Sequence, residues 1–245
     1  WLYLPWVIKP FWSPFVDLLK TKRWWVVTMQ MLVGAGLAGV AFTLPTDFFF
    51  QASLAVFWLV AFSSATHDIA ADGYYMLALE PHEQAFFVGI RSTFYRISTI
   101  AGQGILVMIA GALETSTGKI PMSWSITFFI MAGLFIAFCL YHKFILPKPA
   151  SDKPSVTVTA SNLMKEFFAT FASFFKKKQV AIAILFMLFY RFPEAQLVKL
   201  ITPFLIDPRE VGGLGLTTTE IGLTYGTIGI IGLTVGGILG GILAS

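Results

Sequence analysis

Long apolar runs separated by short polar segments dominate the chain. Most of the runs approach or exceed the roughly twenty residues that an α-helix needs to cross a bilayer. Their apolar residues are continuous and do not alternate with polar ones, which excludes the strands of a membrane β-barrel. The pattern predicts an all-α polytopic membrane protein with seven helices, expected at 1–16, 24–44, 48–78, 86–112, 122–146, 179–206 and 217–244.

Composition leads to the same class of protein. Apolar residues make up 56% of the chain and charged residues only 12%, whereas charged residues are about 25% of a typical soluble domain. The single cysteine, Cys139, excludes disulfides within the chain and cysteine-based metal sites. The sequence also lacks the HExxH and GxSxG patterns, so we expect neither a metal site nor an enzyme active site.

The stretch GAGLAG at 34–39 matches the GxGxxG pattern of dinucleotide-binding sites. It lies inside a predicted spanning helix and no strand precedes it, so the context that such a site needs is missing. Small residues instead let neighbouring helices approach closely in a membrane. We therefore expect these glycines to pack helices together, and we expect no cofactor.

Lysine and arginine residues gather in alternate connections between the predicted helices. Because cytoplasmic loops carry the excess of these residues, the richer side is expected to be cytoplasmic. Only Lys119 and Arg209 fall on the other side. The net charge of +4 is thus explained by orientation in the membrane, and it does not indicate a nucleic acid partner. The cytoplasmic set comprises Lys20, Lys22, Arg23, Lys143, Lys148, Lys153, Lys165, Lys176, Lys177 and Lys178.

A long connection divides the predicted helices into two groups. We expect a helical half at 1–146, a cytoplasmic linker at 147–178 and the start of a second helical half at 179–245. Within the linker, KPASDKPSVTVTA is rich in proline, serine and threonine, and SNLMKEFFATFASFFKKK has the periodicity of an amphipathic helix. Such a helix either lies on the membrane surface or covers the cytoplasmic face of the protein.

Charged residues inside the predicted spans are candidates for function, because a charge in hydrocarbon is costly. If the third and fourth runs form a hairpin that turns near His82, Asp68 and Arg96 both lie about 21 Å from the turn. Asp72 and Arg91 both lie about 14 Å from it. Matching depth and opposite charge predict two ion pairs, Asp68–Arg96 and Asp72–Arg91. A static lock of the hairpin is the alternative to a functional role.

The remaining charges within spans lie near prolines. Arg191 and Glu194 are three residues apart on one helical face, with Pro193 between them and Lys199 further along the same run. Lys9 stands between two prolines. Because proline interrupts the hydrogen bonds of a helix, these positions are typical of the broken helices from which transporters build sites at mid-membrane. Snorkelling of Lys9 to the interface is the alternative.

Several stretches resemble a known family of transporters. WVIKPFWSPFVDLLKTKRWW is similar to the second helix and following loop of a major facilitator, with Ser13 where that family usually has glycine. KPFWSPFVD, THDIAADGYY, the Tyr95–Arg96 pair, LFYRFPEA and TPFLID together resemble the AmpG-type muropeptide permeases and their relatives, the acetyl-CoA transporters. The resemblance covers essentially the whole chain. It implies a cytoplasmic gate formed by Asp17, Lys20, Lys22 and Arg23.

The resemblance also implies a twelve-helix major facilitator fold, of which this chain would be a fragment from helix two to helix eight. The implied activity is secondary active transport by alternating access: proton-coupled symport of an anionic muropeptide or similar organic anion, by a monomer in the inner (plasma) membrane. An efflux or acetyl-CoA-type carrier and a non-transporting membrane sensor are the alternatives. His67 replaces the family's usual glutamine, and Arg191 and Glu194 stand where the permeases tend to carry lysine and aspartate. The replacements at Arg191 and Glu194 keep the sign of the charge. We therefore expect the family's mechanism to carry over to this chain, whereas the identity of the substrate can differ.

Charge type assigns a role to each candidate. Guanidinium and ammonium groups suit the carboxylate or phosphate groups of an anionic substrate. Burial favours the protonated form of a carboxyl group and a neighbouring cation favours the charged form, so a buried acid beside a cation can take up and release protons. We expect substrate binding by Lys9, Arg96, Arg191 and Lys199. We expect proton coupling by Asp68, Asp72 and Glu194.

Overall fold

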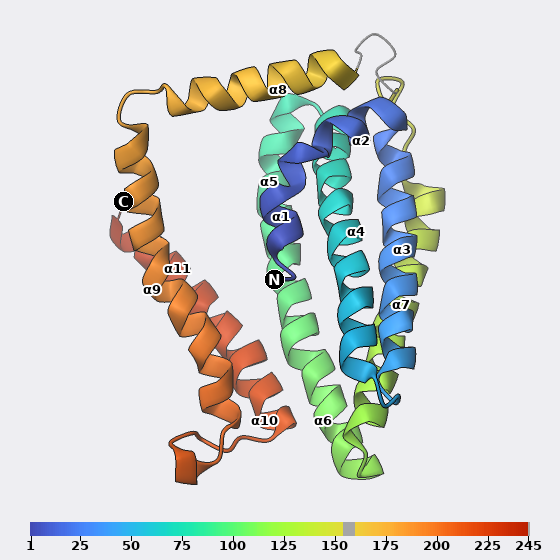
Figure 1. Ribbon diagram of the computed structural model, residues 1–245, viewed down its shortest axis with the longest axis vertical. Helices are drawn as coiled ribbons and strands as arrows, with labels where there is room; N and C mark the ends of the chain where they lie inside the picture. Colours follow the sequence, from blue (N-terminus) through green and yellow to red (C-terminus); the bar gives the residue numbers. More distant parts are fainter. Residues whose placement is uncertain (154–159, 245) are drawn as a thin grey trace. The chain divides into compact units, whose positions relative to one another are not determined.

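The computed structural model describes residues 1–153 and 160–244, and throughout them every regular element is a helix (Figure 1). This confirms the predicted all-α class. The order is α1 (Leu4–Ile8), η1 (Lys9–Phe11), α2 (Ser13–Leu19), α3 (Lys22–Thr43), α4 (Phe49–Ala78), α5 (Pro81–Thr99), η2 (Ile100–Ile105), α6 (Leu106–Thr117), α7 (Ile120–Ile145), α8 (Ala160–Phe175), α9 (Val180–Ile206), η3 (Arg209–Val211), α10 (Thr218–Leu223), η4 (Thr224–Ile228) and α11 (Gly229–Ala244).

Five of the described helical stretches are long and apolar enough to cross a membrane. They are Lys22–Thr43, Phe49–Ala78, Thr93–Thr117, Ile120–Ile145 and Val180–Ile206. The expected seventh run forms α10, η4 and α11 in succession.

The first run is interrupted, as the prolines on either side of Lys9 predict, and so it is not the single helix that its length alone suggests. It is broken into α1, η1 and α2, and a proline stands in the first turn of each piece: Pro5, Pro10 and Pro14. Proline has no backbone N–H to donate and fits the start of a helix better than its interior. Closely spaced prolines therefore produce three short helices in place of one long one.

The chain divides by its internal contacts into two compact units. The first comprises Trp1–Ser98 and Ile109–Ala160, and the second comprises Thr99–Met108 and Ser161–Ser245. The three segments expected from chain order remain a prediction.

Glycines of α3 allow close packing within the first unit, where α3 contacts both α4 and α7. A Cβ atom at Gly36 would lie 2.5 Å from Val60 Cγ2 on α4, and one at Gly34 would lie 3.0 Å from Ile136 Cγ1 on α7. Neither position accepts a side chain without movement of its neighbour. The stretch GAGLAG is therefore a helix-packing surface, as its sequence context predicts.

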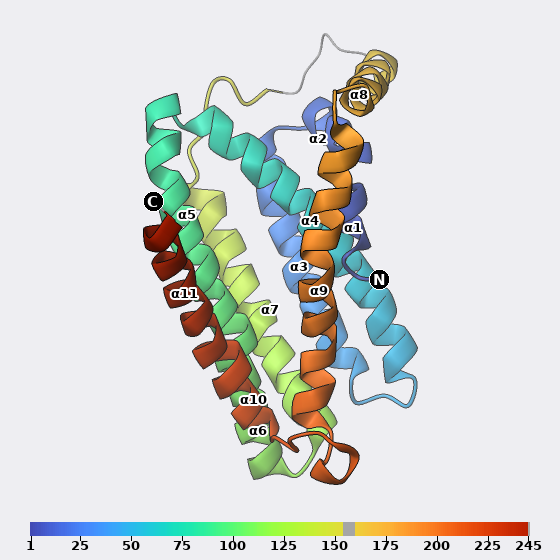
Figure 2. The same cartoon turned by 90° about the vertical axis from the view of Figure 1, so that its left-hand side faces the viewer.

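α4 and α5 are joined by a tight turn. Gln84 Nε2 donates a hydrogen bond to Leu79 O at 2.9 Å, and Glu80 N donates one to Glu83 Oε2 at 2.8 Å. The two helices diverge from this turn (Figure 2). The predicted hairpin therefore exists, and its two arms are closer together near the turn than further along.

Two π-helical segments contact each other in the second unit. η2 packs against η4, and glycines bring their backbones together. A Cβ atom at Gly226 would lie 1.9 Å from Gln103 O, and one at Gly104 would lie 2.4 Å from Thr227 Oγ1. Such π-segments widen a helix locally and often occur at functional positions.

The predicted amphipathic segment forms the helix α8. Phe167 and Phe168 make an edge-on ring contact, and the side chains of Phe168 and Phe175 are exposed. Whether the apolar face of this helix meets the membrane or the protein remains a prediction.

We expect Gly226→Ala to destabilise the protein, because the added methyl group forces η2 and η4 apart. Overpacking of this kind costs about 1–3 kcal/mol. Gly232→Ala is the matched control, since nothing lies within 4 Å of a Cβ atom there and alanine favours a helix over glycine. Thermal unfolding of the purified protein in detergent measures both variants. Equal midpoints would contradict the contact between η2 and η4.

Candidate functional site

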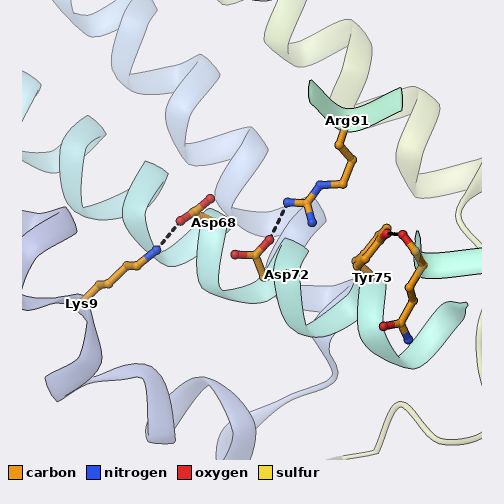
Figure 3. Close-up of polar contacts among 6 residues, drawn as sticks. Lys9, Asp68, Asp72, Tyr75 and Arg91 are labelled. Carbon is orange, nitrogen blue, oxygen red and sulfur yellow. Dashed lines mark hydrogen bonds and ion pairs between the residues drawn. The ribbon is translucent and has the colours of Figure 1, made fainter. Parts of the chain in front are cut away.

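An ion pair joins the N-terminal segment to α4. Lys9 Nζ, at the start of η1, donates to Asp68 Oδ2 (Figure 3). Their side chains are 30% and 42% exposed. Trp12 Nε1 donates to Thr66 Oγ1 at 3.1 Å and ties the same two segments together. Lys9 begins the short helix that the break in the first run creates, so this break positions the cation beside α4.

A second ion pair joins α4 to α5. Arg91 Nη2 donates to Asp72 Oδ1 at 2.5 Å (Figure 3). The guanidinium carbon of Arg91 lies 4.7 Å from the centre of the Tyr75 ring, a distance at which a cation and an aromatic face attract. The hydroxyl of Tyr75 in turn donates to the carbonyl oxygen of Gln84. Asp72 and Arg91 therefore meet as their matching depth predicts, and Tyr75 helps to orient the cation.

The two acids of these pairs lie on one face of α4. Asp68 and Asp72 are four residues apart, a spacing at which like charges repel. Lys9 and Arg91, which come from different segments, each offset one of the negative charges.

Asp68 has a partner that the predicted site did not pair with it. Its described ion pair is with Lys9, from a segment outside the hairpin, whereas matching depth proposed Arg96. The Asp68–Arg96 pair remains a prediction.

Two polar side chains in the first unit were missed by sequence reasoning. His142 Nδ1 on α7 lies 3.0 Å from Gln30 Oε1 on α3, and the two residues are too far apart in the sequence for any spacing to relate them. His67, which the sequence analysis did single out, lies on α4 with its Nε2 atom buried and without a hydrogen-bond partner among the described residues. No group of three His, Cys, Asp or Glu in the described parts of the chain could hold a metal ion.

The charges of α9 form a local pair. Arg191 Nη1 donates to Glu194 Oε2, and both side chains are more than half exposed within the second unit. Lys199 is exposed on the same helix. The expected interruption at Pro193 is wrong, because α9 runs unbroken through Pro193 and Pro203. A proline removes one backbone donor, and a long membrane helix tolerates that loss.

The N-terminus of α3 is capped by a residue from the start of the linker. Asp152 Oδ1 accepts from Lys22 N at 2.6 Å, and Asp152 Oδ2 accepts from Arg23 N at 3.0 Å. Asp152 is 9% exposed. Both carboxylate oxygens thus satisfy backbone donors that a helix start leaves without an intrahelical partner.

Two further side chains hold the same part of the linker. Arg23 Nε donates to Leu146 O at 3.0 Å, and Arg23 Nη2 donates to Lys143 O at the end of α7. Tyr74 on α4 donates through its hydroxyl to Pro147 O at 2.9 Å. We call Arg23, Tyr74 and Asp152, with their backbone partners, the linker clasp. Asp152 was missed because a Pro/Ser-rich sequence is typical of an unstructured linker.

The structure describes only part of the gate that the family resemblance implies. Arg23 binds the end of α7, and Lys20 and Lys22 line a cavity next to the clasp. The side chain of Asp17 lies outside the described residues. The gating role of these four residues remains a prediction.

Comparison with known proteins covers the whole chain. A model of the family described as "Major Facilitator Superfamily" matches residues 2–245. "Anhydromuropeptide permease" of Escherichia coli (strain K12) is 27% identical over 243 residues, which are 97% of this chain and 45% of that protein. "Putative transporter AmpG 4" of Rickettsia conorii is 27% identical over 98% of this chain and 56% of its own length. An uncharacterized protein of Haemophilus influenzae is 26% identical over 98% of this chain and 54% of its own length.

The chain spans about half the length of the curated relatives it matches. No solved structure matches it significantly.

We expect Asp152→Ala to loosen the linker clasp, because the first two N–H groups of α3 lose their acceptors. Loss of a helix cap costs about 1–2 kcal/mol. Asp152→Asn keeps one acceptor oxygen and is expected to lose less. Thermal unfolding and the rate at which proteinase K cleaves the linker measure the change. An Asp152→Ala protein with the wild-type unfolding midpoint and cleavage rate would show that the clasp contributes nothing.

We expect Lys9→Gln and Asp68→Asn each to destabilise the protein by about 1–2 kcal/mol, a value between those for an exposed pair and for a broken buried pair, because both groups are partly exposed. The charge-swapped double variant, Lys9→Asp with Asp68→Lys, is expected to recover part of the loss of its single variants. A double-mutant cycle on unfolding free energies gives the coupling. Additive effects would rule out a direct interaction.

Proposed function

We propose that this chain, which belongs to the Major Facilitator Superfamily, acts as a secondary active transporter that carries a small organic anion together with protons. The family consists of membrane transporters and not of enzymes. One observation carries the proposal: two acids on one face of α4, each paired with a cation from another segment, lie within a helix long and apolar enough to span the membrane. Charged groups at that depth are costly and mark transport pathways.

Competition for a cation supplies the coupling step. Lys9 neutralises Asp68 while no substrate is bound. When a carboxylate of the substrate pairs with the Lys9 ammonium, Asp68 loses its partner and the neighbouring charge of Asp72 favours its protonation. One negative charge and one proton then enter the site together, so the charge inside the membrane does not increase. Release of the anion returns Lys9 to Asp68 and expels the proton.

The substrate class follows from the cations and from the relatives. Lys9, Arg96, Arg191 and Lys199 are the proposed binding residues, and arginine can hold a carboxylate through two parallel hydrogen bonds. Relatives over nearly the whole chain include an anhydromuropeptide permease, so we propose an anionic peptidoglycan fragment. Glu194, beside Arg191, is proposed as a second proton carrier. The transporter works by alternating access, as a monomer in the inner membrane.

The test is uptake of a labelled anhydromuropeptide by inverted and right-side-out vesicles that contain the intact protein. Uptake is measured with and without an imposed pH gradient, and exchange is measured at equal pH. Asp68→Asn is expected to abolish gradient-driven accumulation and to leave exchange. Lys9→Gln is expected to raise KM roughly tenfold or more, because a charge-assisted hydrogen bond is lost. Lys119→Gln, in the opposite loop, is the matched control and is expected to behave as wild type.

Three outcomes contradict parts of the proposal. Equal loss of accumulation and exchange in Asp68→Asn would assign that residue a structural role. Uptake that does not depend on the pH gradient would show that transport is not coupled to protons. A folded protein that takes up no anhydromuropeptide under either condition would exclude this substrate class.

A further inference from the structure

A cavity of about 310 Å³ lies beside the linker clasp, within the first unit. Lysines from three segments line it: Lys20 between α2 and α3, Lys22 at the start of α3, and Lys153 in the linker. Met76 and Leu77 of α4 supply an apolar side, and their side chains are 60% and 40% exposed. The cavity therefore combines positive charge with exposed apolar surface.

Contacts within the first unit hold Lys22 and the linker segment that carries Lys153. The stem of Lys22 crosses α4 at Gly73, where a Cβ atom would lie 2.8 Å from Lys22 Cε. The linker is held next to α3 by Asp152, whose carboxylate oxygens accept from backbone N–H groups. Asp152 also lines the cavity, so three ammonium groups stand against one carboxylate. The lining keeps a net positive charge.

We propose that this cavity binds a phosphate group, supplied by the headgroup of an anionic phospholipid. Lysine is a common binder of phosphate. The excess of lysine and arginine places this side of the protein at the cytoplasmic leaflet, whose anionic lipids attract lysines next to the membrane. The exposed side chains of Met76 and Leu77 suit the acyl chain of a lipid, whereas inorganic phosphate gains nothing from them. A bound headgroup would join the α2–α3 connection to the linker.

Native mass spectrometry of the intact, delipidated protein in detergent tests the site. The probes are a phosphatidylglycerol, a phosphatidylcholine and inorganic phosphate, each titrated separately. Lys20→Gln with Lys153→Gln removes two cavity charges. Lys143→Gln with Lys148→Gln removes two charges from the same side of the protein outside the cavity and is the matched control. Gly73→Ala, which displaces Lys22, perturbs the cavity without changing any charge.

Wild type is expected to retain phosphatidylglycerol in preference to phosphatidylcholine. The cavity double variant is expected to bind phosphatidylglycerol roughly tenfold more weakly, Gly73→Ala more weakly than wild type, and the control double variant like wild type. Equal affinities in the cavity and control variants would overturn the proposal. Lysine-dependent binding of inorganic phosphate without retained lipid would support the phosphate site and overturn its lipid source.

Discussion

The cost of placing charge in hydrocarbon is the constraint on which the candidate site depends. α4 carries two acids one turn apart within a helix that is long and apolar enough to span a membrane, where an unpaired charge is costly. Each acid has a cationic partner from a different segment: Lys9 from the proline-broken N-terminal segment, and Arg91 from the neighbouring helix. The proposed coupling of proton uptake to transport rests on these two pairs.

The adjoining ends of α3 and α7 in the first unit are also organised by charged groups, which here are bonded to backbone atoms. Asp152 caps α3, and Arg23 binds the carbonyl oxygens at the end of α7. Through Asp152 the first residues of the linker are bonded to α3, and through Arg23 α3 is bonded to the end of α7, which the linker follows. The lysine-lined cavity lies beside this junction, so a lipid headgroup bound there would act on the linker and on the α2–α3 connection together.

Much of the fold follows from the sequence because membrane helices are specified locally. A continuous apolar run of sufficient length must satisfy its own backbone hydrogen bonds, and in lipid a helix is the simplest way to do so. The runs at 24–44, 48–78, 122–146 and 179–206 accordingly appear as α3, α4, α7 and α9. The Asp72–Arg91 pair could also be predicted from the sequence, because both residues are close to the turn that joins α4 to α5 and that turn fixes their separation.

Only the tertiary structure decided which distant groups meet. Lys9 is 59 residues from Asp68, and Asp152 is 130 residues from Lys22, so no periodicity relates them. Prolines at three positions determined that the first run would break, but the direction in which Lys9 then points depends on packing against α4. The sequence by itself determined the class of protein, its helices and the residues that must be compensated in a membrane. Which partner compensates each of these charged residues depended on packing, because Coulomb attraction acts between any two opposite charges that the fold brings close together.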